Sequence, residues 1–255
     1  METYIGEGKY IYCIIGRERI RAFGPLGIGE RGDELHTVCS GDIAAVVSNS
    51  PIKSYPVARE NLLAHEKAIE EVMKAHTVLP VRFCTIAKNE EKVEKILETE
   101  HDRFSRLLEN MKGKKELGLK AVFKEELIYK AILEKNEDIK KLKEIISRET
   151  PAKTYYQRTE IGRKVEAALQ KEKDRYKDEI LNTLTPLTRE VKVNAPYGEL
   201  MIISAAFLVD SGREAEFDRA VGTLADKAGD KIKFKYTGTL PPFNFVNLVI
   251  ETGRY

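Results

Sequence analysis

The sequence predicts an α+β protein of two domains, an N-terminal α/β layer sandwich and a C-terminal ferredoxin-like fold with a long helical insertion. Two patterns support this class. Runs rich in β-branched and aromatic residues, such as residues 9–16, are typical of strands, and apolar side chains spaced three or four apart, as in residues 57–76, are typical of amphipathic helices. Since 42% of the 255 residues are hydrophobic, the chain can bury two cores.

The first predicted domain comprises residues 1–112. Its strands are expected over residues 9–16, 35–40, 43–48 and 78–83, and its helices over residues 57–76 and 89–113. The turn sequence Ser-Gly-Asp at residues 40–42 predicts that the second and third strands pair as a hairpin. Leu62 and Leu63 are expected on the buried face of the first helix, and Asn89 is the predicted N-cap of the second.

The second predicted domain comprises residues 113–240 and has the element order β-α-β-β-α-β of the ferredoxin-like fold. Its strands are expected over residues 117–124, 189–194, 199–209 and 231–237, and its helices over residues 127–146, 153–184 and 213–228. About 32 residues from 153 to 184, at 1.5 Å each, give a helix of roughly 48 Å, so part of it should extend beyond the sheet. Ser211 is the predicted N-cap of the last helix.

Residues 241–255 are predicted to be an apolar tail that docks on the N-terminal domain. Pro241 and Pro242 prevent the preceding strand from continuing. The large apolar side chains that follow are Phe243, Phe245, Val246, Leu248, Val249 and Ile250. Because leaving them in water would forfeit roughly 1.5–3 kcal/mol for each that could be buried, we expect the tail to be ordered and to pair with an edge of the N-terminal sheet.

Charge and hydropathy argue against several classes of function. The chain carries 43 basic and 41 acidic side chains, so a nucleic acid is not an expected partner. The longest uncharged apolar run is far short of the ~20 residues that a membrane span needs, and the acidic N-terminus lacks a signal-peptide pattern. A cytoplasmic protein is therefore expected. Cys13, Cys39 and Cys84 lie in apolar segments and are expected to be buried free thiols.

Residues 27–32, Gly-Ile-Gly-Glu-Arg-Gly, match the G-x-G-x-x-G pattern of dinucleotide-binding loops. That pattern binds a pyrophosphate only where the loop leads from a strand into a helix. Here Asp33 and Glu34 follow, and then a predicted strand. Because two carboxylates beside the loop would also repel phosphate, a loop between strands is favoured over a nucleotide site.

The histidines and cysteines do not form a recognisable catalytic or metal site. His36 and Cys39 lie three apart on a predicted strand and so point to opposite faces. The helix with His65 lacks the second His of a zinc protease, and nothing in the sequence brings a His to Cys84. We therefore predict no catalytic residue, no cofactor and no metal ion. His65 and Arg82 are predicted to be structural, Arg82 as a guanidinium that ties the layers together.

Four separated motifs resemble the gas vesicle protein F/L family, and together they cover residues 10–250. The opening strand, Tyr-Ile-Tyr-Cys-Ile at residues 10–14, and the second hairpin strand at residues 41–48 are similar to those of the family. The motif residues of the two more specific segments are His65, Glu66, Pro80, Arg82 and Phe83 in the first, and Gly238, Pro241, Pro242 and Phe245 in the second.

The resemblance implies a non-enzymatic accessory protein or minor structural component of the gas vesicle. The implied partners are the small, very hydrophobic major shell protein, which risks aggregation before assembly, and other gas vesicle accessory proteins. The implied role is to bind the shell protein and aid nucleation of the vesicle. The chain departs from the family pattern at Cys84, where Gly is usual, at Thr239, where Pro is usual, and at Leu240, where an aromatic residue is common. Membership of the F or the L subtype stays open.

Two other classes of function stay open from the residues. One is a small-molecule-binding or regulatory ferredoxin-like module, which a concave polar pocket between sheet and helices would favour. The other is an enzyme that uses the loop at residues 27–32. The preferred interpretation is an assembly protein that is located in the cytoplasm and at the gas vesicle.

Overall fold

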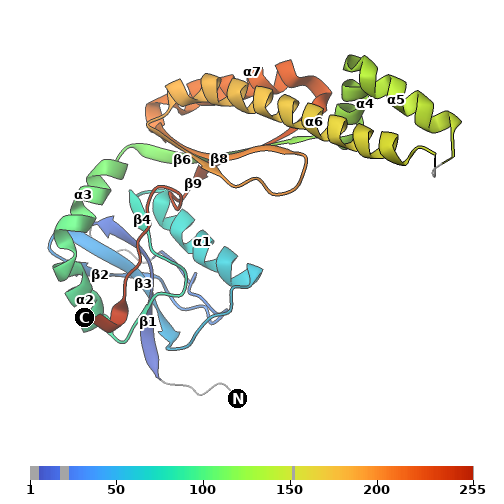
Figure 1. The fold of residues 1–255 in the computed structure, drawn as a ribbon. Coiled ribbons are helices and arrows are strands. Elements are labelled where there is room, and N and C mark those ends of the chain that lie inside the picture. The colour runs from blue at the N-terminus through green and yellow to red at the C-terminus, as the bar shows by residue number, and fades with distance from the viewer. Residues whose placement is uncertain (1–5, 18–22, 151–152, 255) are drawn as a thin grey trace. The chain divides into compact units, whose positions relative to one another are not determined.

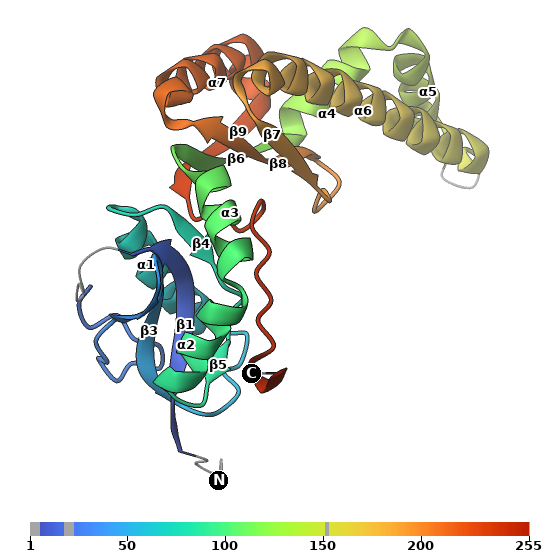
Figure 2. The ribbon, with the colours of Figure 1, turned by 90° about the vertical axis from the view of Figure 1, so that its left-hand side faces the viewer.

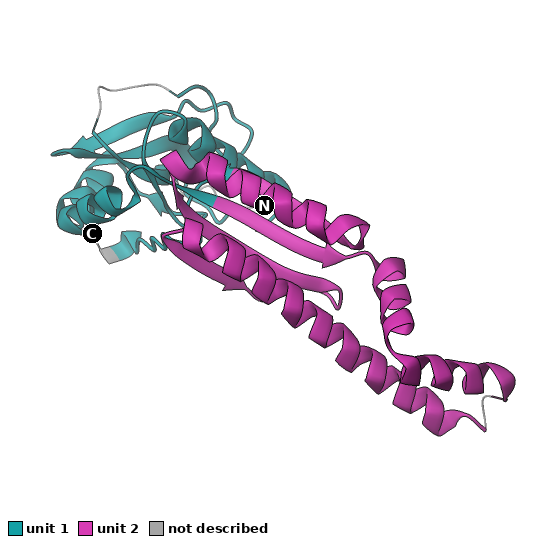
Figure 3. Cartoon of the chain, turned by 90° about the horizontal axis from the view of Figure 1, so that it is seen from above, with its two compact units in different colours: residues 1–116, 239–255 teal, residues 117–238 magenta. Residues whose placement is uncertain are grey.

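The chain folds into two compact units, each built of helices and strands. The structure, a computed structural model, describes residues 6–17, 23–150 and 153–254 (Figure 1). Unit 1 contains residues 1–116 together with residues 239–255, and unit 2 contains residues 117–238 (Figure 3). Because helices and strands are mixed in both units, the predicted α+β class is confirmed.

A sheet of five strands forms the centre of unit 1. The strands are β1 (Glu7–Gly16), β2 (His36–Ser40), β3 (Ile43–Pro51), β4 (Val78–Pro80) and β5 (Ile86–Ala87). They follow the order β2-β3-β1-β4, and β5 also pairs with β1. β1 runs antiparallel to β3, β4 and β5. β2 and β3 form the predicted hairpin, and Gly41 in its turn has a φ of +59°, which favours glycine.

Helices cover both faces of this sheet. α1 (Arg59–Met73) lies on one side, and α2 (Glu90–Thr99) with α3 (His101–Met111) lies on the other (Figures 1 and 2). β1 is consequently apolar along most of its length, and residues 10–15 are almost completely buried. Asn89 caps α2 as predicted, because its side chain accepts a hydrogen bond from the backbone N–H of Lys92 at 3.0 Å.

The single helix expected over residues 89–113 is two helices, which meet at Glu100. The hydroxyl of Thr99, the last residue of α2, donates to the carbonyl of Lys95 at 2.8 Å. The break lets each half bury its own apolar side chains. These are Val93, Ile96 and Leu97 in α2, and Phe104, Leu108 and Met111 in α3.

The strand expected over residues 78–83 ends earlier, at Pro80. The chain then turns, and the hydroxyl of Thr85 closes the turn by donating to the carbonyl of Arg82 at 2.7 Å. Cys84, inside this turn, has a φ of +64°. A left-handed residue cannot continue a strand, which is why the short strand β5 starts only at Ile86.

Unit 2 has a four-stranded sheet in the order β7-β8-β6-β9. Its strands are β6 (Lys114–Phe123), β7 (Glu190–Asn194), β8 (Met201–Asp210) and β9 (Ile232–Leu240), and its helices are α4 (Glu125–Lys135), α5 (Glu137–Arg148), α6 (Tyr155–Leu184) and α7 (Glu214–Ala228). With α4, α5 and α6 counted as one connection, the element order is the β-α-β-β-α-β of the ferredoxin-like fold. The first and last of these strands, β6 and β9, are neighbours in one sheet.

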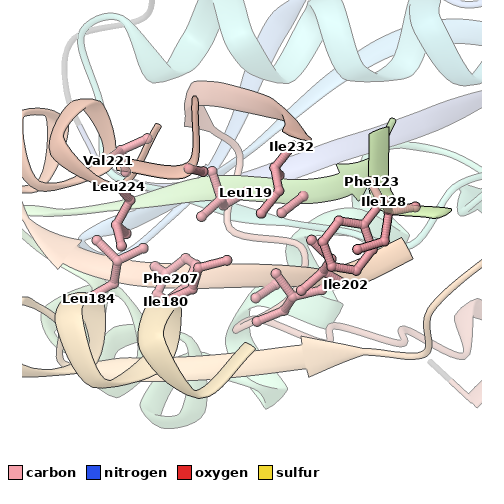
Figure 4. Close-up of a cluster of buried hydrophobic side chains, with 14 of the residues drawn as sticks. Leu119, Phe123, Ile128, Ile180, Leu184, Ile202, Phe207, Val221, Leu224 and Ile232 are labelled. Atoms are coloured by element: carbon pink, nitrogen blue, oxygen red, sulfur yellow. The ribbon is translucent and has the colours of Figure 1, made fainter. Parts of the chain in front are cut away.

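The core of unit 2 lies between this sheet and the helices α6 and α7 (Figure 4). Leu119 of β6 and Phe207 of β8 belong to the same buried cluster as Ile180 and Leu184 of α6 and Leu224 of α7. These apolar positions recur every three to four residues along the helices, so the periodicity that predicted the helices also predicted which face is buried.

The helix α6 spans 30 residues, or about 45 Å. It extends past the strands, as the sequence predicts, and α5 packs along its outer part (Figure 3). Ile139 is the buried residue of α5, so this helical hairpin is largely exposed. No helix within residues 6–17, 23–150 and 153–254 has the length and apolar character that a membrane span requires.

Ser211 does not cap α7, contrary to the prediction. Residues 211–213 form a short 3-10 helix, and α7 begins after it, at Glu214, with no side-chain cap. Glu214 and Glu216 occupy the first turn of α7, where a negative charge interacts favourably with the helix dipole.

Candidate functional site

His65 lies on the inner face of α1 and is only 3% exposed. Its ring makes two hydrogen bonds: Nε2 lies 3.1 Å from the carbonyl oxygen of Val81, and Nδ1 lies 3.1 Å from the hydroxyl of Tyr10. Because a carbonyl only accepts, Nε2 carries the proton and Nδ1 accepts from Tyr10. Burial lowers the pKa of His65 to about 4, so the imidazole is uncharged at neutral pH.

The Tyr10 hydroxyl links His65 to the turn that follows β4. It donates to His65 and accepts from the backbone N–H of Cys84 at 2.8 Å. Burial raises the pKa of Tyr10 far above its ordinary value, so the hydroxyl keeps its proton. Cys84 adopts a left-handed backbone here, a conformation that favours glycine.

The glycine-rich loop at residues 27–32 is a packed connection that leads to the strand β2. Ile28 is fully buried, and its backbone N–H donates to the hydroxyl of Tyr12 at 2.7 Å. A Cβ on Gly27 would lie 2.8 Å from Asp33, so a glycine is required by close packing. The loop is therefore not at the start of a helix, the position that a phosphate-binding loop needs.

His65 also lines an open pocket of about 410 Å³, which we call the unit 1 pocket. It lies between α1, the turn after β4 and the C-terminal tail. Its lining residues are Leu62, His65, Glu66, Pro80, Arg82, Phe83, Phe243, Val246, Asn247 and Leu248. Ligand sites in proteins typically have volumes of about 300–1,000 Å³ and mostly apolar walls with a few polar groups. The unit 1 pocket has both properties.

The unit 1 pocket brings together five of the motif residues that the sequence singled out, namely His65, Glu66, Pro80, Arg82 and Phe83. The rings of Phe83 and Phe243 lie with their centroids 5.7 and 6.1 Å from that of His65. The other motif residues do not line the pocket: Pro241 and Pro242 are buried at the start of the tail, Phe245 is half-buried, and Gly238 lies in β9 of unit 2.

Leu62 and Leu63 are not on the buried face of α1, contrary to the prediction. Each is 41% exposed. His65 takes the inward position instead, which a polar residue can do because both of its nitrogens are hydrogen-bonded. Leu62 lines the unit 1 pocket and Leu63 does not. Together with Phe243, which is 40% exposed, Leu62 gives the pocket an accessible apolar rim.

The side chain of Arg82 does not tie the layers of unit 1 together, contrary to the sequence interpretation. The side chain is exposed, and its guanidinium has no hydrogen-bond or ion-pair partner among the described residues. The backbone of Arg82 performs the structural role instead. Its N–H donates to the carbonyl of Leu248 at 3.0 Å, and its carbonyl accepts from Thr85.

The C-terminal tail forms part of the pocket because two sets of contacts hold it. Val81, just after β4, makes a parallel bridge to Leu248. The backbone N–H and the side-chain amide of Asn244 both donate to the carboxylate of Glu116, at 3.0 and 2.6 Å, and Glu116 is buried. Val246 and Leu248 are buried in the same stretch. These contacts place the tail at the β4 edge of the sheet.

The other predicted candidates are not brought into this pocket. His36 lies 3.4 Å from the carboxylate of Glu90, and the described residues contain no group of three or more His, Cys, Asp or Glu side chains that could hold a metal ion. Of the three free cysteines, Cys13 is buried, but Cys39 and Cys84 are half-buried, so burial was wrongly predicted for two of them. The sulfur of Cys84 accepts a hydrogen bond from the N–H of Tyr55 at 3.3 Å.

Five of the pocket residues were not selected from the sequence as site residues: Leu62, Phe243, Val246, Asn247 and Leu248. The signal for Leu62 was present, because it precedes His65 and Glu66 by three and four positions and so shares their helix face. The other four lie in the tail, whose apolar character predicted docking on the N-terminal domain, but no local pattern showed which part of that domain they reach.

The comparisons with known proteins agree with the sequence resemblance. The family model described as "Gas vesicle synthesis protein GvpL/GvpF" matches residues 8–247. Gas vesicle protein F of Dolichospermum flosaquae is 27% identical over 217 residues, which cover 84% of this chain and 88% of the relative. Gas vesicle protein F of Streptomyces sp. (strain CB03234) is 28% identical over 220 residues, which cover 86% and 91%.

The fold is also similar to that of a solved relative. The crystal structure of the gas vesicle protein GvpF from Anabaena sp. PCC7120 matches with a TM-score of 0.80 and 24% identity, over 96% of this chain and all of that chain. Since the family model spans almost the whole chain, the chain belongs to the GvpL/GvpF family of gas vesicle synthesis proteins and takes part in gas vesicle formation.

Proposed function

We propose that this protein is a non-enzymatic accessory protein that binds the hydrophobic major shell protein of the gas vesicle at the unit 1 pocket and aids nucleation of the vesicle. The observation that carries the proposal is the apolar pocket with its accessible rim of Leu62 and Phe243. Such a site suits an apolar partner, because burying apolar surface yields roughly 25 cal/mol per Å². The protein would act in the cytoplasm and at the vesicle, together with other accessory proteins.

The chemistry of the pocket supports binding rather than catalysis. A general base needs an available lone pair and a pKa close to the working pH. His65 has both ring nitrogens engaged and a pKa lowered to about 4 by burial. The neighbouring Tyr10 has a raised pKa and already donates to His65. The His65 ring and the Tyr10 hydroxyl therefore stabilise the folded structure beneath the pocket and are not suited to proton transfer.

A small apolar molecule is the second candidate for the occupant, because the pocket volume falls in the range typical of ligand sites. A regulatory ferredoxin-like module would be favoured by a polar pocket between sheet and helices. The unit 1 pocket is mainly apolar and lies outside the ferredoxin-like unit, so it does not support that alternative. A pocket of more polar character lies in unit 1 between the end of the sheet, the segment after α1 and the helix α3, and Arg17, Asp42 and Lys112 are among its lining residues. For the mainly apolar unit 1 pocket, the shell protein is the preferred occupant.

The test is a pair of neighbouring substitutions, Leu62→Glu and Leu63→Glu. Both leucines are equally exposed, but only Leu62 lines the pocket. We expect Leu62→Glu to weaken capture of the purified shell protein by tenfold or more, because a buried Leu contributes roughly 1.5–3 kcal/mol and about 1.4 kcal/mol corresponds to a factor of ten. Leu63→Glu should bind as the wild type does. Equal binding by both variants would show that the pocket is not the binding site.

A further inference from the structure

The unit 1 pocket carries two charged side chains, Arg82 and Glu66, that do not neutralise each other. No ion pair joins them, and neither has an ion-pair or hydrogen-bond partner for its side chain among the described residues. Some other charged side chains of unit 1 are paired, such as Arg31 with Glu7 and Lys9 with Glu90. At the rim of this otherwise apolar pocket, both charged side chains are therefore available to form ion pairs with a partner.

Arg82 is the better anchor of the two. Its backbone is fixed on both sides, by the bond from its N–H to Leu248 and by the bond from Thr85 to its carbonyl. The backbone thus fixes the position from which the side chain extends, and the guanidinium presents a planar fork of donors that fits a carboxylate. A carboxylate that met it would form charge-assisted hydrogen bonds, which are stronger than neutral ones.

Glu66 is the weaker anchor. It is half-buried, and burial together with the negative charge of Glu70 raises its pKa. Its anionic form is thus held in an unfavourable environment, and it repels a second carboxylate that enters the pocket. An acidic partner group is consequently drawn toward Arg82 and away from Glu66.

We propose that the unit 1 pocket recognises a protein segment in which an acidic side chain lies next to a large apolar side chain. The apolar side chain enters between Leu62, Phe83 and Phe243, and the carboxylate binds the guanidinium of Arg82. This inference rests on the proposed function, because it names the kind of segment of the shell protein that the pocket takes. It makes Arg82 a residue that determines which segment binds, while the apolar walls supply most of the affinity.

The experiment uses the full chain and synthetic peptides that tile the sequence of the major shell protein. Each binding peptide is also made with its Asp and Glu residues replaced by Asn and Gln. We expect the wild-type protein to prefer the acidic form by about tenfold, a factor that corresponds to about 1.4 kcal/mol. Arg82→Gln should lose this preference, and Arg82→Lys should retain part of it because it keeps the charge without the fork.

Removing the charge of Glu66 should change the affinity for the acidic peptide in the opposite direction from removing the charge of Arg82. Glu66→Gln removes a repulsion and should tighten binding of the acidic peptide by roughly two- to threefold, the range of an exposed charge interaction. The control Arg106→Gln makes the same charge change as Arg82→Gln on the helix α3, outside the pocket lining, and should leave binding unchanged. The thermal unfolding of Arg82→Gln should match that of the wild type, because no described residue forms a hydrogen bond or ion pair with its guanidinium.

The outcomes separate this inference from the proposed function. If Arg82→Gln keeps the preference for acidic peptides, or if Glu66→Gln weakens binding, the acidic recognition is wrong, while loss of binding in Leu62→Glu would still support the pocket as the shell-protein site. If neither the peptides nor the intact shell protein bind the wild type, the proposed function fails and this inference fails with it.

Discussion

Replacing His65 with Ala should lower the free energy of unfolding by about 3 kcal/mol. The substitution removes both the donor to the Val81 carbonyl and the acceptor for the Tyr10 hydroxyl, and both of these groups are buried. A buried polar group that loses its partner costs roughly 1–3 kcal/mol, and the space left by the ring adds to this cost. Urea denaturation followed by circular dichroism measures the change.

His65→Gln is the matched control, because an amide can donate to Val81 and accept from Tyr10. It should retain most of the stability that His65→Ala loses. If His65→Ala unfolds at the same urea concentration as the wild type, the hydrogen bonds of His65 do not stabilise unit 1, and the residue would have to be explained as part of a partner interface.

The same histidine should make stability depend on pH. Its pKa is lowered from 6.5 to about 4 on folding, so the unfolded chain binds the proton more readily. Stability is therefore complete above pH 6.5 and falls as the pH drops from 6.5 to about 4, by roughly 3 kcal/mol in total. His65→Gln should lack this component, so its pH profile should be flatter than that of the wild type in that window.

Deleting residues 241–255 should lower the free energy of unfolding by about 3–6 kcal/mol, as much as the loss of His65 or more. The deletion exposes the β4 edge and removes Val246 and Leu248, each of which contributes roughly 1.5–3 kcal/mol when fully buried. It also removes the two hydrogen bonds from Asn244 to the buried Glu116. Thermal unfolding of the truncated and full-length chains measures the difference.

Two neighbouring substitutions test the tail without truncation. Leu248 is 2% exposed and Val249 is 44% exposed, so Leu248→Ala should destabilise the protein by about 2–5 kcal/mol and Val249→Ala should change it little. Hydrogen exchange adds a local measurement: amides over residues 245–250 should exchange slowly in the isolated protein. Fast exchange there, slowed only when the shell protein is added, would mean that the tail itself is the binding element.

Much of the fold follows from local patterns. The turn at residues 40–42 specifies the β2–β3 hairpin, the periodicity of residues 153–184 specifies the long helix α6, and Asn89 specifies the start of α2. Prediction failed at two places where the backbone changes direction. One is the break between α2 and α3 at Glu100, and the other is the turn closed by Thr85. Neither leaves a periodic signal.

The candidate site was predictable only in part. The motif residues His65, Glu66, Pro80, Arg82 and Phe83 were selected by resemblance, and the structure places all five at one pocket. Hydrophobicity alone put Leu62 in the core and gave no reason to bury His65, because the two partners that satisfy the histidine lie 16 and 55 residues away in the sequence. The exposure of Arg82 likewise depends on the turn and on the tail.

Site-specific photo-crosslinking to the major shell protein tests the proposed binding at the unit 1 pocket most directly. A photoreactive amino acid is placed at Phe243, on the accessible rim of the unit 1 pocket, or at Val57, which is 80% exposed and lies outside the pocket lining. We predict a covalent adduct with the shell protein from position 243, its loss in the Leu62→Glu background, and no adduct from position 57. Equal adducts from both positions, or none from position 243 under conditions in which the two proteins bind, would contradict binding at the unit 1 pocket.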